Sequence, residues 1–131
     1  MSCSSPSDNP HGYQSRRTIA SRAVPGVDFT IARMSFGRRI ELTRQIRELG
    51  RKLEFLEAGS DFRERLEAAV LAVEIDRLYL RWGLKEVSGL ILDGEPATPE
   101  SLIEKGPEEL TREILSAVKA ECGLSEEERK N

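Results

Sequence analysis

The sequence predicts a mainly α fold: a small helical domain with an antiparallel helix hairpin, C-terminal helices and a minor β-hairpin. Residues 35–58, 61–82 and 107–122 repeat apolar side chains at spacings of three and four, which is typical of helices that bury one side. Aromatic residues make up only 5% of the chain, so aliphatic side chains must supply most of the packing. The length of 131 residues fits one domain with one main core.

The N-terminal part of the chain lacks the apolar periodicity of a folded element. Residues 1–25 mix Ser, Pro, Asn, Gly and Arg, so we expect a disordered N-terminal segment before a single helical domain at residues 26–131. At the start of that domain, Val27, Phe29 and Ile31 alternate with polar or small residues. This alternation predicts a short strand with one covered face.

The first predicted helix runs from Ser35 toward Ala58. Ser35 is suited to cap its N-terminus, and the sequence Ala58-Gly59-Ser60 is suited to end it. A leucine-rich seam recurs along it at spacings of four and three: Leu42, Ile46, Leu49, Leu53 and Leu56. Because the seam spans only about two heptads, we expect it to pack against the next helix in an antiparallel hairpin rather than form a coiled coil.

The second predicted helix, at residues 61–82, has apolar side chains on two opposite sides. At about 100° per residue, one side comprises Phe62, Leu66, Ala69, Val73 and Leu80. The other side, roughly 180° away, comprises Leu71, Ile75, Leu78 and Trp82. We expect the Phe62 side to bury the leucine seam. The opposite side then requires a second internal layer or a partner.

Two interpretations of that opposite side remain open. The later helix or the β-hairpin could cover it, which would make it part of the chain's own core. Left partly open, it would suit an amphipathic partner helix laid into an apolar groove. The predicted partner-binding residues are Leu71, Ile75, Leu78, Tyr79 and Trp82, with Tyr79 as a polar contact at the rim.

The C-terminal third of the chain predicts a β-hairpin followed by two helices. Asp93-Gly94 is a strong signal for a tight turn between short strands. Thr98 followed by Pro99 predicts the start of a short helix. A longer helix is expected from Pro107, and one side of it is apolar: Leu110, Ile114, Ala117 and Val118.

Charge is unevenly distributed along the chain. The formal net charge is −3, but residues 1–58 carry 10 Lys and Arg against 6 Asp and Glu, a balance of +4. Residues 59–131 carry 10 against 17, a balance of −7. This asymmetry is consistent with self-association through oppositely charged parts, or with nucleic-acid contact through the basic part.

The sequence contains none of the usual signatures of an enzyme. It has no glycine-rich phosphate loop, no nucleophile elbow and no HExxH pair. Cys3 and Cys122 have neither disulfide nor metal-ligand spacing, and His11 lies in the polar N-terminal segment. We therefore expect no catalytic residues, no cofactor and no metal. No apolar run approaches the ~20 residues of a membrane span, so we expect a cytoplasmic protein without a membrane partner.

A basic patch on the first predicted helix is the main alternative site. Arg44, Arg47 and Arg51 share the helix side opposite the leucine seam and could reach phosphates. Glu41, Glu48 and Glu54 dilute the patch, and the sequence has no aromatic stacking platform. Nucleic-acid binding is therefore a less favoured interpretation than partner-protein binding.

Several ordered runs of residues extend from about Val27 to the C-terminus: VDFTIARMSFGRRIEL, FLEAGS, EIDRLYLRWGL, VSGLILDGEPATPESL, GPEELTREILSAVKAECGL and SEEERKN. Together they resemble tail assembly chaperones of long-tailed bacteriophages and prophages, over roughly four fifths of the chain. The resemblance lies in these runs and includes no catalytic signature. It leaves the N-terminal segment unexplained.

The resemblance implies a non-enzymatic assembly factor in the cytoplasm of the bacterial host. Residues 26–131 would then be a chaperone-like domain that binds the tape measure protein and keeps it soluble until the tail tube assembles. The tail tube protein is a further candidate partner, and self-association would fit this behaviour. Two alternatives stay open: a small nucleic-acid-binding regulator that uses the arginine-rich first helix, and a structural head-tail component.

Overall fold

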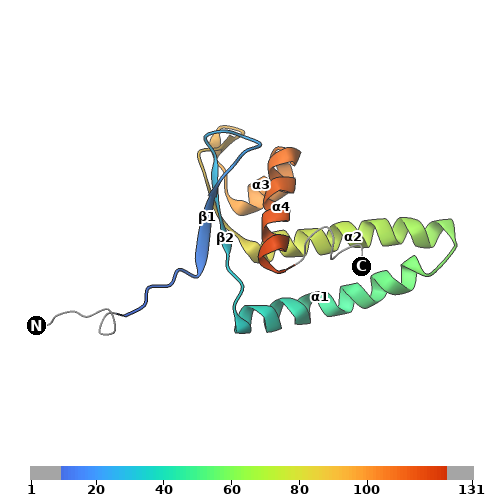
Figure 1. The fold of residues 1–131 in the computed structure, drawn as a ribbon. Helices are drawn as coiled ribbons and strands as arrows, with labels where there is room; N and C mark the ends of the chain where they lie inside the picture. The colour runs from blue at the N-terminus through green and yellow to red at the C-terminus, as the bar shows by residue number, and fades with distance from the viewer. Residues whose placement is uncertain (1–9, 124–131) are drawn as a thin grey trace, which may run out of the picture.

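The computed structural model describes residues 10–123 of the protein (Figure 1). Helices account for 57% of these residues, so the prediction of a mainly α fold is confirmed. The elements in chain order are β1 (Arg16–Ala20), β2 (Asp28–Ala32), α1 (Phe36–Glu57), α2 (Phe62–Gly83), β3 (Leu84–Ser88), β4 (Ile91–Leu92), β5 (Glu95–Pro96), α3 (Pro99–Lys105) and α4 (Glu108–Glu121).

A three-stranded antiparallel sheet has β2 at its centre, between β1 and β3. Val27, Phe29 and Ile31 are all at most 2% exposed, so the predicted short strand with one covered face is confirmed. Its partner β3 follows α2 directly, and the register between β2 and β3 shifts between Thr30 and Ile31. The sheet thereby joins the end of α2 to the start of the described chain.

The prediction that residues 1–25 are disordered is wrong for part of that segment. Arg16–Ala20 forms β1, which pairs with β2 over its whole length, and Thr18 hydrogen-bonds Thr30 across the pair at 2.8 Å. The strand was missed because, of its five residues, Ile19 is the one large apolar side chain, so period-2 alternation is absent. Backbone pairing with β2 holds it instead. Residues 1–9, including Cys3, lie outside the described residues.

Helices α1 and α2 form a long antiparallel hairpin that extends away from the sheet (Figure 1). Ser35 caps α1 by accepting a hydrogen bond from the backbone N–H of Arg38, as predicted. Asp61 caps α2 by accepting from the backbone N–H of Arg63. The end of the hairpin, at the connection between the two helices, projects beyond the sheet, α3 and α4.

The predicted β-hairpin is formed by β4 and β5. Asp93 and Gly94 have φ values of 51° and 85°, which are the positive values that a type I′ turn requires. After it, Thr98 and Ser101 form a capping box with Pro99 in the first turn of α3, so the predicted helix start is confirmed.

Helix α4 supplies much of the core. Leu110, Ile114 and Val118 are each 0% exposed, on the side that the sequence predicted to be apolar. Helix α2 ends at Gly83, which packs against α4. A Cβ added at Gly83 would lie 2.6 Å from a methyl carbon of Val118. Glycine at this position therefore allows the C-terminal end of α2 to approach α4 closely.

A second contact ties α4 to the loop between β1 and β2. The Glu113 carboxylate accepts hydrogen bonds from the Ser21 hydroxyl at 2.6 Å and from the Arg22 backbone N–H at 2.7 Å, with a longer one from Ala23 at 3.4 Å. Burial opposes ionisation, but these hydrogen bonds outweigh it and lower the pKa of Glu113. The charged carboxylate is therefore the form that stabilises the loop.

Replacing Glu113 by glutamine is expected to lower the free energy of unfolding by about 1–2 kcal/mol near neutral pH, because the amide NH₂ faces a backbone donor. A carboxylate with a lowered folded pKa contributes stability above its unfolded pKa of about 4.3 and loses it as pH falls through the folded value. Urea unfolding from pH 7 to pH 3 should show the difference from wild type shrinking. Glu109→Gln, on the exposed side of the same helix, is the control. A pH-independent difference would contradict this role.

Candidate partner-binding surface

The structure reverses the predicted orientation of α2. Leu71, Ile75 and Leu78 are half-buried, and Ile75 and Leu78 pack against the core cluster. Tyr79 and Trp82 are buried, at 9% and 8% exposure. Most of the predicted partner-binding side therefore packs within the chain itself, which favours the first of the two interpretations of this side.

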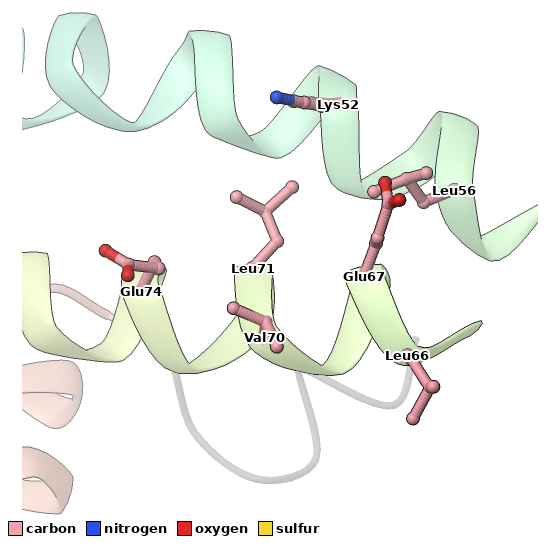
Figure 2. A pocket seen from close by; sticks show the side chains of 7 residues that line it. All are labelled: Lys52, Leu56, Leu66, Glu67, Val70, Leu71 and Glu74. Atoms are coloured by element: carbon pink, nitrogen blue, oxygen red, sulfur yellow. The ribbon is translucent and has the colours of Figure 1, made fainter. Parts of the chain in front are cut away.

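The sequence predicted the wrong side of α2 to pack against α1, because both sides are apolar and a helical wheel cannot show which of them is buried. In the structure, the seam of α1 packs against the Leu71 side, and Leu71 points toward α1 (Figure 2). Helices α3 and α4 lie against only the C-terminal end of the Phe62 side, where Leu80 and Gly83 are buried. Because α3 and α4 do not extend further, no element within residues 10–123 covers the N-terminal part of that side.

This part of α2 exposes four large apolar side chains along one side of the helix. Phe62 is 71% exposed, Leu66 53%, Val70 61% and Val73 65%. We call these four residues the α2 stripe. They recur at spacings of four, four and three, which aligns them along one side of about three helical turns. Such a continuous row is more informative than isolated exposed apolar residues, because rows of this kind are typical of interaction sites.

A groove lies beside the α2 stripe, between the two helices near the end of the hairpin. It has a volume of about 330 Å³ and is lined by Lys52, Leu56, Leu66, Glu67, Val70, Leu71 and Glu74. Figure 2 shows Leu66 pointing away from α1, whereas Glu67 and Leu71 point toward it. The groove and the stripe thus offer apolar surface with charged groups at the rim, the arrangement that an amphipathic helix recognises.

The predicted arginine patch lies on α1, and Arg47 also lines a pocket that Tyr79 of α2 shares. Arg44, Arg47 and Arg51 are exposed. None of them forms an ion pair with any of residues 10–123. Phe36 and Phe55 are exposed on the same helix, at 86% and 73%. The patch is therefore accessible to an anionic partner.

The described residues supply few groups with perturbed chemistry. Burial raises the pKa of the Cys122 thiol to about 11, only partly opposed by Arg39, so the thiol stays protonated and weakly nucleophilic at neutral pH. Within residues 10–123, no three His, Cys, Asp or Glu side chains are grouped so as to hold a metal ion. No helix in the same range is both long and apolar enough to cross a membrane.

Fold and surface together define a mainly helical protein whose long hairpin carries an uncovered apolar row. No protein-family model, curated protein or solved structure matches the chain.

Proposed function

We propose that the protein is a phage tail assembly chaperone that binds the tape measure protein and keeps it soluble for tail tube assembly. The α2 stripe carries this proposal, because it is an accessible apolar row of the length that one segment of an amphipathic helix needs. The sequence runs that resemble tail assembly chaperones support the choice of client. The proposed binding surface lies on the Phe62 side of α2, and not on the Leu71 side that the sequence predicted.

The physical task matches a small surface of this kind. A long helical client with exposed apolar rows aggregates unless those rows are covered during assembly. A surface of four apolar side chains binds weakly, which permits later displacement by tail tube subunits. Because each copy binds weakly, many copies bound along one client are needed to keep its apolar rows covered. Assembly of this kind takes place in the cytoplasm of the bacterial host.

Co-expression tests the proposal directly. The wild-type protein is expected to raise the soluble yield of the tape measure protein several-fold, and the double variant Leu66→Asp, Val70→Asp is expected to lose this gain. Both side chains are more than half exposed, so the charges should cost little stability. Circular dichroism and urea unfolding of each variant check that the fold is intact.

The control is Ile40→Asp, which places one such charge at a half-exposed apolar residue on α1. It should retain the full gain in soluble yield. The proposal is contradicted if the wild-type protein gives no gain, or if a correctly folded stripe variant gives the same gain as the wild type.

The arginine patch favours a second candidate function, a small nucleic-acid-binding regulator. Arg44, Arg47 and Arg51 are exposed and unpaired among the described residues, and phosphate contacts by such side chains give strongly salt-dependent affinity. Titration of labelled RNA and DNA at about 50 and 200 mM salt separates the two candidates. A flat binding curve at both salt concentrations removes this one.

A further inference from the structure

The α2 stripe is nearly symmetric about its own centre. When a second copy of α2 runs in the opposite direction, Phe62 of one copy lies opposite Val73 of the other, and Leu66 lies opposite Val70. The spacings of four, four and three make all four residues of each copy meet an apolar partner in this register. The contact is isologous, because both copies use the same residues, as two-fold symmetry requires.

Charges beside the stripe have the same symmetry. Arg63 and Glu74 are exposed and eleven positions apart, which is close to a whole number of turns, so they lie on one flank of α2. Neither forms an ion pair with any other residue in the described range 10–123. In the antiparallel arrangement, Arg63 of each copy faces Glu74 of the other. The flank is thus complementary to itself in charge.

A hollow at the base of the hairpin matches the largest side chain of the stripe. It has a volume of about 340 Å³ and lies where α2 meets α3 and α4. Four apolar residues line it, together with charged and polar ones: Val73, Leu80, Ile103 and Leu115, and Asp76, Arg77, Glu108, Thr111 and Arg112. In the antiparallel register, Phe62 of a second copy lies at the Val73 end of this hollow. Phe62 is the most exposed residue of the stripe, and its ring can pack against the four apolar residues of the hollow while the charged ones form the rim.

We propose that, without a client, two copies of this chain pair through the α2 stripe in an antiparallel arrangement held by reciprocal Arg63–Glu74 ion pairs. The stripe supplies only four apolar side chains per copy, whereas a stable interface buries about 800 Å² on each partner. The dissociation constant should therefore be weak, on the order of 100 µM. Pairing covers the surface assigned to the client, so client binding separates the copies; this consequence alone rests on the proposed function.

Sedimentation velocity over a range of protein concentrations at low ionic strength tests the pairing. Arg63→Glu and Glu74→Arg each replace two attractions by two repulsions, so each should weaken pairing at least about tenfold. Combining the two substitutions restores opposite charges in reversed positions and should return the dissociation constant to within about threefold of wild type. Leu66→Asp should abolish pairing, and Ile40→Asp should not change it.

A wild-type protein that stays monomeric up to about 1 mM would overturn the proposal. So would pairing that the single charge substitutions leave unchanged, or a double substitution that fails to restore it, because either result requires another register or surface. Circular dichroism confirms that each variant is folded. Arg63→Glu keeps the α2 stripe, so it should still raise the soluble yield of the tape measure protein; this separates failure of the pairing from failure of the proposed function.

Discussion

Replacing Phe29 by alanine is expected to lower the free energy of unfolding by about 3–5 kcal/mol. Phe29 is 1% exposed in β2, the middle strand of the sheet, where it belongs to the core cluster with Val27 and Ile31. Truncation removes a large buried apolar side chain and leaves a cavity that fixed neighbours cannot fill. Urea unfolding followed by circular dichroism gives the difference.

The control for this prediction is Phe55→Ala, which removes the same side chain from an exposed position on α1. It should change the free energy of unfolding by less than about 0.5 kcal/mol. Equal losses for Phe29 and Phe55 would mean that the sheet is not part of the core in solution, and the position of β2 would then be wrong.

Removal of Asp76 is expected to give the second large loss, about 2–4 kcal/mol. Its carboxylate lies 2.7 Å from the Lys119 ammonium, which joins α2 to α4, and the Lys119 side chain is only 9% exposed. Asp76→Ala therefore leaves a buried ammonium without its partner. Lys119 also lies 5.6 Å from the centre of the Tyr79 ring, but this contact replaces only part of the lost interaction.

The converse variant should behave differently. In Lys119→Met the buried side chain becomes apolar, and the remaining Asp76 side chain is 37% exposed and can be hydrated. We expect a loss of less than about 1 kcal/mol, measured by the same urea unfolding. If Lys119→Met is as damaging as Asp76→Ala, the ion pair contributes through its charge interaction and not through the cost of an unpaired buried ammonium.

The two large predictions concern residues outside the α2 stripe. Phe29 and the Asp76–Lys119 pair hold the sheet, α4 and the C-terminal end of α2 together. The α2 stripe lies in the other half of the hairpin, where few contacts outside α1 hold the helix. Substitutions in the stripe can therefore change binding at little cost in stability, which makes the binding experiments interpretable.

Sequence alone determined most of the helices and turns of this protein. Ser35 and Thr98 cap helices, and Asp93-Gly94 forms the turn of the small hairpin, as their local chemistry predicts. These signals act over a few residues, so the neighbouring residues suffice to read them. Strand β1 was missed because its stability comes from pairing with β2, and its own residues carry no alternation.

Only the tertiary structure decided which side of α2 is covered. Both sides carry apolar residues at helical spacing, so the sequence indicated a two-sided helix without showing which side binds α1. The close approach of Gly83 to Val118 sets α4 against the C-terminal end of α2, and α1 takes the Leu71 side. Phe62, Leu66, Val70 and Val73 stay exposed because burial depends on contacts between residues far apart in the chain, which local periodicity does not contain.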